Sequence, residues 1–372
     1  MGFQEVCAGG LVGTLAAVAM GVACGSAGTE PSASRTPASG RDCPPDASVG
    51  ESRGGLASPP PPGPMQRSDG TGTVTFAMSR ILWGNADPNG TPGPDAWKQF
   101  GYNIDGVAPS NIAAFCRPPQ GGSPTIVHEE GIDGIENAFG HIVLPLLQPT
   151  VPQTCNSTCC AIPQPFAVVL SLDQLGAGAS YNPLSARVAG GTDLDVDAGL
   201  CGIPVPRFDG TDVWSMQQGT SESLPGSYLV NDTWVSGPIA KLSVVYQGLG
   251  PEPGPPVLLD IVHAQISMKL DPTHKTAMVG IISGVLPTAD LKQRLSALVG
   301  SFSTSLCNSP TLQSLLDSVG QASDIMQDGT QDPTRTCDAI SIGLGFAASI
   351  DQLGSTAPSV TAPDPCLGDA GE

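Results

Sequence analysis

Residues 257–270 read VLLDIVHAQISMKL, and residues 276–285 read TAMVGIISGV. Both stretches have the length and the content of apolar and β-branched residues that are typical of strands. Residues 271–275, which read DPTHK, join them with turn-forming residues. The two stretches therefore predict a β-hairpin with a longer loop, and they favour a mainly β fold.

Other strand-like stretches lie on both sides of this hairpin. Turn-forming Gly, Pro, Asn and Asp separate them, and the chain holds 47 Gly and 37 Pro. No helices alternate with these strands, which favours antiparallel pairing. We predict an antiparallel β-sandwich, jelly-roll-like, with a few short helices and stapled by disulfides. The further expected strands are 73–78 leading into 81–83, 166–172, 192–200, 239–246 and 339–350.

Two segments of the chain favour helix instead. Residues 134–147 place apolar side chains at near-helical spacing, and Asp133 is expected as the N-cap. Residues near 288–320 predict two short helices. Ser309 is expected to cap the second of them, with Pro310 at its first position.

The N-terminus indicates export. Residues 11–23 form an uncharged apolar run that suits a signal peptide over residues 1–23 and is too short to span a bilayer. Cys24 follows small residues and resembles the lipid-bearing cysteine of bacterial lipoproteins. Gly21 stands where Leu is usual, so cleavage elsewhere, for example after Ala27, stays open.

The rest of the chain divides by composition. Residues 24–72 are rich in Gly, Pro and Ser and predict a disordered tether. Residues 73–354 hold enough apolar residues for a β-rich globular domain, and residues 355–372 form a C-terminal tail. This layout predicts an extracytoplasmic protein, either a lipoprotein of the outer membrane or cell surface or a secreted protein.

The chain contains 11 Cys, which in an exported protein favours disulfides. We expect a bond between Cys307 and Cys337, because it would enclose the second helical segment and attach it to the last strand. The partners of the other cysteines stay open, since many connectivities are consistent with the sequence.

The charge balance bears on function. A formal net charge of −19 argues against a nucleic-acid partner. Motifs for a nucleophile elbow, a zinc helix or a phosphate loop are absent from the sequence. We therefore favour a non-enzymatic binding or structural module with a carbohydrate or protein ligand. The alternative is a secreted hydrolase, acting on polysaccharide with paired carboxylates drawn from the surplus of acids.

Residues 128–137, HEEGIDGIEN, gather acids and an amide in a Gly-bounded turn. Oxygen-rich turns suit calcium, which takes six to eight oxygen ligands. The competing explanation is a helix start, in which Asp133 caps, Glu136 adds favourable charge to the first turn and Asn137 holds a neighbouring loop. The candidate ligands are Asp133, Asn137, Asp105 and, as a weaker member, Glu130.

Two phrases of the sequence belong together. Residues 97–106 read WKQFGYNIDG, and residues 131–140 read GIDGIENAFG. The chain resembles uncharacterised secreted proteins of myxobacteria, which share a W-x-x-x-G-x-N-x-D-G … D-G-x-[DE]-N-x-F-G pattern, although Glu136 stands where Asp is usual. The resemblance implies an extracytoplasmic location and a shared architecture, and it implies no activity.

Overall fold

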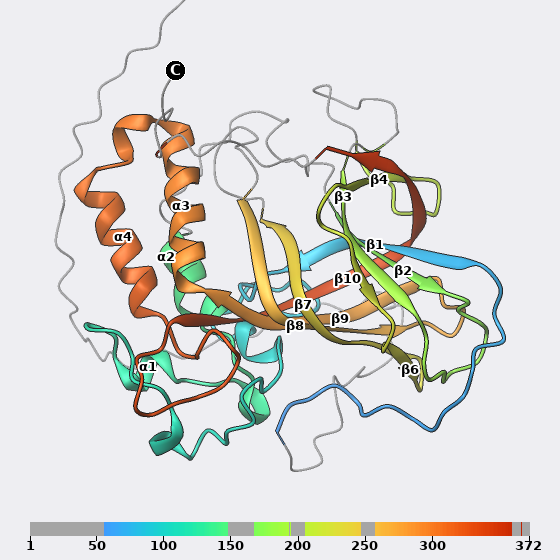
Figure 1. Cartoon of the computed structure of the whole chain (residues 1–372), viewed down its shortest axis with the longest axis horizontal. Coiled ribbons are helices and arrows are strands. Elements are labelled where there is room, and N and C mark those ends of the chain that lie inside the picture. The colour runs from blue at the N-terminus through green and yellow to red at the C-terminus, as the bar shows by residue number, and fades with distance from the viewer. Residues whose placement is uncertain are drawn as a thin grey trace, which may run out of the picture. The chain divides into compact units, whose positions relative to one another are not determined.

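The mainly β prediction is confirmed, since ten strands join in one mixed sheet (Figure 1). A computed structural model describes residues 56–147, 167–192, 194, 205–246, 257–358 and 366. The strands are β1 (Thr73–Leu82), β2 (Ala167–Asp173), β3 (Ala186–Thr192), β4 (Val213–Gln217), β5 (Glu222–Leu224), β6 (Tyr228–Val230), β7 (Thr233–Tyr246), β8 (Val257–Leu270), β9 (Thr276–Pro287) and β10 (Ala339–Ala357).

The predicted hairpin is present as β8 and β9. The two strands are antiparallel, and Leu270 pairs with Ala277 at the turn end. Asp271 holds the connecting turn together, because its carboxylate accepts hydrogen bonds from the Lys275 and Thr276 backbone N–H groups at 2.7 and 2.8 Å. β7 extends the hairpin to a third antiparallel strand.

The longest strand, β10, connects two parts of the sheet. It pairs antiparallel with β9 and β1, and its last residues pair parallel with β4. The pairings β1–β2, β2–β3, β3–β4, β4–β10 and β10–β1 close a circuit of five strands, which we call the strand ring. The remaining strands β9, β8, β7 and β6 extend from β10 as an open arm.

A sandwich of two antiparallel sheets is not confirmed. One core cluster contains Phe76 and Leu170 from the ring together with Trp234 and Ile282 from the arm. The arm therefore shares one apolar core with the ring without forming a second sheet. The physical reason is the length of β10, which has 19 residues and belongs to both parts. The pairing of β10 with β4 is also parallel, where only antiparallel pairs were expected.

Two glycines permit close packing around this strand. A Cβ on Gly343 of β10 would lie 2.0 Å from the backbone oxygen of Phe100, so only glycine lets residues near 100 lie directly on the strand. A Cβ on Gly191 of β3 would lie 2.7 Å from Val169 and 3.3 Å from Trp214. Gly191 therefore makes room for the indole of Trp214, which is fully buried.

The first helical segment differs from its prediction. Residues 135–137 are not helical; a short π-helix spans Phe139–Val143 and continues as α2 (Leu144–Leu147). Asp133 does not cap it, because Asp133 has φ 55° inside a separate 3₁₀ turn and the N-cap position of the π-helix is Ala138. Instead Asn137 Oδ1 accepts a hydrogen bond from the Gly140 N–H at 3.0 Å, so the first turn is organised from within the expected helix.

The second helical segment matches its prediction. It contains α3 (Thr288–Phe302) and α4 (Pro310–Gln321), which cover one end of the sheet (Figure 1). Ser309 caps α4 by accepting a hydrogen bond from the Leu312 N–H at 3.1 Å. A four-residue helix α1 (Pro124–Val127) and short 3₁₀ turns lie among the loops between β1 and β2.

The expected Cys307–Cys337 bond is wrong. Cys337 is bonded to Cys116, and Cys307 is bonded to Cys366. The reason is that the segment before β10, which contains Cys337, lies beside the segment that contains Cys116. The Arg117 N–H donates a hydrogen bond to the Arg335 backbone oxygen at 2.9 Å, which holds the two segments together. The first bond therefore joins the loops after β1 to the entry of β10. Cys7, Cys24, Cys43, Cys155, Cys159, Cys160 and Cys201 lie outside the described residues.

The folded part of the chain extends beyond both predicted bounds of the globular domain, residues 73 and 354. Residues 56–72, expected within the disordered tether, lie along the body as an extended strap. Tyr228 donates a hydrogen bond to the Pro60 backbone oxygen at 2.6 Å, and Gln66 exchanges two backbone hydrogen bonds with Asn182. The proline-rich run is already extended, so docking it costs little chain entropy.

At the other end of the body, β10 continues to Ala357, and Cys366 ties part of the expected tail to α3 and α4. Across the part of the chain that the structure describes, no helix has the length and apolar character needed to cross a membrane. The expected strand at 192–200 falls almost wholly outside the described residues.

Candidate functional site

An open pocket of about 630 Å³ lies against the strand ring. Its walls come from β1, β2, β3, β5 and the distal part of β10, and most of the lining side chains are polar. The lining residues are Thr73, Thr75, Ser171, Asp173, Ser185, Ala186, Arg187, Ser223, Pro225, Asp351, Gln352 and Leu353.

Strand register explains why these side chains gather. Thr75 pairs with Asp351 on one side and with Ser171 on the other, and Ser171 pairs with Arg187, which pairs with Ser223. Residues paired across neighbouring strands point to the same face. The pairings therefore form one polar row across five strands.

The other face of the same strands is apolar. Phe76, Leu170 and Val188 alternate with the polar row and belong to the main core. Beyond the polar row, Ala77, Val169 and Trp214 form a small apolar cluster. Ala77 and Val169 are one step further along the face that carries Thr75 and Ser171. Leu353 lines the pocket and packs against this cluster, which we therefore call the floor of the pocket.

Asp351 connects the pocket to this floor. Its Oδ2 accepts a hydrogen bond from Trp214 Nε1 at 2.9 Å, and its Oδ1 accepts one from the Asp212 N–H at 3.0 Å. Burial raises the pKa of Asp351 to about 6, the nearby Asp212 carboxyl adds to the rise, and the hydrogen bond from Trp214 opposes it. The floor therefore contains a carboxyl group that changes charge near neutral pH.

The predicted calcium ligands separate into different surroundings. Asp105 and Glu130 come near two acids that the sequence did not single out as ligands, Glu136 and Asp324. We call these four residues the carboxyl cluster. Asn137 lies nearby, but its amide group already makes hydrogen bonds to the backbone. Its Nδ2 donates to the oxygens of Trp97, Phe100 and Gly343. Its Oδ1 accepts from the N–H groups of Gly140 and Gly343. Asp133 is exposed.

Burial and mutual repulsion favour the protonated forms in the carboxyl cluster. Burial raises the pKa of Glu130 to about 8, with Asp105 as the next cause, and burial raises that of Asp324 to about 7 against the hydrogen bonds from Ser341. The pKa of Glu136 is raised well above its usual value, first by burial and then by Asp105. Glu136 Oε2 accepts a hydrogen bond from the Ile104 N–H at 2.7 Å, so it holds the preceding loop and not a helix start.

Two oxygens of the carboxyl cluster have no hydrogen-bond partner, Asp105 Oδ2 and Glu130 Oε2. Among the described residues, no group of three or more His, Cys, Asp or Glu side chains is arranged to hold a metal ion. Calcium binding through Asp105 and Glu130 stays a prediction. Asn137 would have to break existing hydrogen bonds to take part in it.

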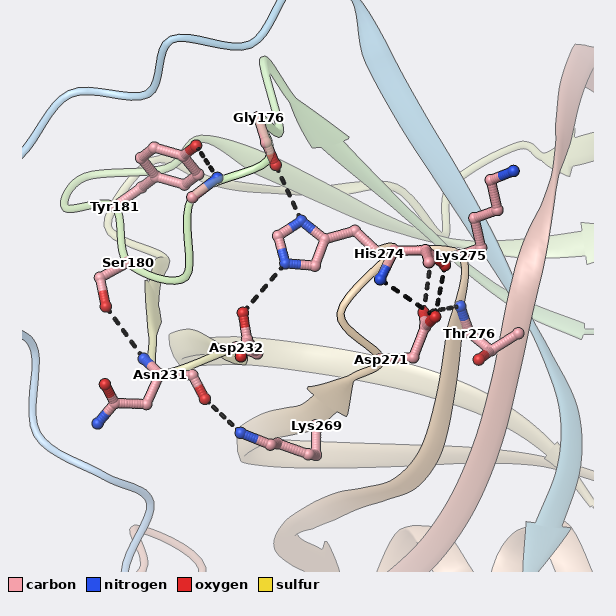
Figure 2. A network of polar contacts seen from close by, with 12 residues as sticks. Gly176, Ser180, Tyr181, Asn231, Asp232, Lys269, Asp271, His274, Lys275 and Thr276 are labelled. Carbon is pink, nitrogen blue, oxygen red and sulfur yellow. Dashed lines mark hydrogen bonds and ion pairs between the residues drawn. The ribbon is translucent and has the colours of Figure 1, made fainter.

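His274 occupies a third polar site, shown in Figure 2. Its Nδ1 lies 2.8 Å from the Gly176 backbone oxygen, and its Nε2 lies 3.2 Å from Asp232 Oδ1. Both ring nitrogens face acceptor oxygens, so both hydrogen bonds form together only when the ring carries two protons. His274 thus ties three turns together and leaves neither nitrogen free to act as a general base.

Sequence reasoning missed the pocket because its residues come from five strands. The one local signal was the alternation of Thr73, Thr75 and Ala77 with apolar neighbours in β1. Trp214 is buried in the core, and its contact with Asp351 is set by the fold. The chain matches no protein-family model, no curated protein and no solved structure.

Proposed function

We propose that the protein is exported, carries a lipid at Cys24, and acts at the cell surface as a non-enzymatic binding module whose ligand enters the strand-ring pocket. The pocket is the observation that carries this proposal. Its size of about 630 Å³ lies within the range of about 300–1,000 Å³ that is usual for small-ligand sites. Its wall offers hydroxyl, guanidinium and carboxyl groups at an open mouth.

Two further features support export. The disulfides Cys116–Cys337 and Cys307–Cys366 are stable in oxidising compartments and rare in reducing ones. Residues 56–72 of the predicted tether dock along the body, so the proposal assigns the flexible role to residues 24–55 on their Gly-, Pro- and Ser-rich composition. A flexible segment of that length would hold the pocket away from the membrane surface.

The lipid is tested by metabolic labelling. Cells that express the full chain receive a clickable palmitate analogue, and the protein is recovered and probed for the label. Label on the natural chain and its loss in Cys24→Ser would support the anchor. Cys43→Ser is the matched control and should keep the label. A natural chain without label would remove the anchor from the proposal.

A hydrolase that acts on polysaccharide is the second candidate. The pocket contains two carboxyl groups, Asp173 and Asp351, and an acid with a pKa of about 6 suits general acid catalysis. Against this, both oxygens of Asp351 already accept hydrogen bonds. The test is release of reducing ends from polysaccharide by the full chain. Activity that is lost in both Asp173→Asn and Asp351→Asn would favour the hydrolase over the binding module.

A further inference from the structure

We infer that the strand-ring pocket binds a neutral saccharide, which it recognises by hydrogen bonds and not by stacking on an aromatic ring. This inference rests on the proposed binding function and names the class of ligand for it. It follows from three properties of the pocket wall: the balance of its charges, the groups left free to bond, and the position of the Trp214 indole, which bonds to the lining residue Asp351.

The charges of the wall disfavour an ionic ligand. Arg187 contributes one positive charge, and Asp173 contributes one negative charge from the neighbouring strand. Asp351 adds a second acid at the floor. An anion at Arg187 would be repelled by both acids, whereas a cation at Asp173 would be repelled by Arg187. A neutral ligand avoids both penalties.

The free groups of the wall match a ligand with many hydroxyls. The Arg187 side chain is exposed, and its guanidinium makes no hydrogen bond or ion pair with another described residue, so its N–H donors are available to a ligand. Thr73 donates to Asp173 Oδ1 at 2.8 Å, which leaves the other carboxylate oxygen available. Adjacent hydroxyls of a sugar both donate and accept, so they satisfy a donor fork and a carboxylate together.

The hydroxyl row extends this match. Thr75 and Ser171 share a hydrogen bond at 3.1 Å, and either oxygen can be its donor. Each hydroxyl can also accept a second hydrogen bond from a ligand. Ser223 continues the row beside Arg187. A wall of this kind would leave an apolar ligand facing unpaired polar groups, which is costly.

Stacking is excluded for the nearest indole. Trp214 is fully buried in the floor, and its ring packs near Phe208 at a centroid distance of 5.9 Å. Its Nε1 nevertheless donates to Asp351, which lines the pocket. The indole N–H of Trp214 is therefore a reporter for a ligand that never touches the ring itself.

The test uses the ¹⁵N-labelled full chain and the indole N–H resonance of Trp214, assigned with Trp214→Phe. The neutral probes are maltotriose, cellotriose and triacetylchitotriose. The charged probes are trigalacturonate and the deacetylated chitotriose. We expect at least one neutral trimer to shift the resonance saturably. Arg187→Gln and Thr75→Val should each weaken that binding, by about tenfold for the arginine.

Arg67→Gln is the matched control, because Arg67 is exposed and outside the pocket, and its affinity should equal that of the natural chain. Tighter binding of a charged trimer than of every neutral one would overturn the ligand class and leave the binding module standing. Equal affinity in Arg187→Gln, with an unchanged unfolding midpoint, would overturn the inference too. If no probe of any class shifts the resonance, the inference fails, and so does the proposal that the ligand of the binding module enters this pocket.

Discussion

The indole N–H of Trp214 donates a 2.9 Å hydrogen bond to Oδ2 of Asp351, across the junction where the parallel strand β4 meets β10. The two residues are 137 positions apart in the chain. Asp351 also accepts the Asp212 N–H, so one carboxylate satisfies two donors in a buried place. This contact links β4 to β10 beside the pocket, where Asp351 is a lining residue.

Asp351→Asn should destabilise the protein. An amide has one acceptor oxygen in place of two, so either Trp214 Nε1 or the Asp212 N–H is left without a partner, at a cost of about 1–3 kcal/mol. Urea unfolding followed by tryptophan fluorescence measures the change. Asp173→Asn, an exposed acid of the same pocket, should change the free energy of unfolding by less than about 0.5 kcal/mol. Equal effects in the two variants would contradict the role given to Asp351.

The same contact predicts a titration. Because burial raises the pKa of Asp351 to about 6, the charge on its carboxylate appears as the pH rises through that value. The Trp214 indole N–H donates to this oxygen, so its resonance should shift with a midpoint near pH 6. The shift should vanish in Asp351→Asn, and a flat profile between pH 4.5 and pH 8 in the natural chain would oppose the assignment.

The carboxyl cluster predicts higher stability in acid than at mildly alkaline pH. Glu130 and Asp324 have pKa values of about 8 and about 7, whereas in the unfolded chain such groups titrate near 4. Between these values the folded protein binds more protons than the unfolded chain, so the free energy of unfolding falls as the pH rises from about 4 to about 8. Chemical denaturation across this range measures the slope.

Glu136→Gln identifies the source of that slope. The amide is neutral at every pH, and its oxygen can still accept the Ile104 N–H, so the variant should show a flatter profile and a relative gain above pH 7. Asp133→Asn is the matched control, an exposed acid on the same loop, and should keep the natural slope. A Glu136→Gln profile parallel to the natural one would place the slope outside the carboxyl cluster.

The disulfide pairs can be read by peptide mapping without reduction. We expect one linked peptide for Cys116 with Cys337 and another for Cys307 with Cys366. The two bonds close 221 and 59 residues, so in the chain-entropy account their removal should cost about 5 and about 4 kcal/mol. Recovery of a peptide that links Cys307 with Cys337 would contradict the structure.

His274→Ala should loosen the turn network of Figure 2. The change removes both hydrogen bonds of the ring, to Gly176 and to Asp232, and should cost about 2 kcal/mol. Amide hydrogen exchange should rise in the loop around residues 174–180. His263→Ala is a close control, since His263 also has positive φ but is exposed in β8. Similar losses in both variants would mean that backbone strain, and not the ring contacts, stabilises the turns.

The local sequence pattern was sufficient to predict several helices and strands. The β8–β9 hairpin followed from two apolar stretches around a turn, and α4 followed from Ser309 and Pro310 in front of an apolar face. Each of these depends on neighbours within a few residues, so the necessary information is contiguous. β3 and β4 were not predicted, because ARVAGGT and VWSMQ are short and contain Gly or polar residues that local propensity disfavours.

The candidate sites were less accessible to prediction. Asp105 and Glu130, predicted as calcium ligands, lie beside further acids, whereas Asn137, predicted as a third ligand, bonds the backbone of β10. A side chain that binds backbone groups 206 positions away leaves no mark in its own segment. The predicted disulfide was wrong for the same reason, because Cys116 and Cys337 are 221 positions apart and lie in segments joined by the pairing of β1 with β10.

The sequence by itself determined the β-rich composition, the main hairpin, the α3–α4 pair and the acidic, cysteine-containing character that argues for an exported protein. Only the tertiary structure decided that β10 is shared between a closed ring and an open arm, and which side chains face each other across the ring. The physical reason is register: pairing between distant strands sets which residues share a face, and it depends on the packing of the whole sheet. The polar row from Asp351 to Ser223 exists only because five strands, far apart in the chain, align in that register.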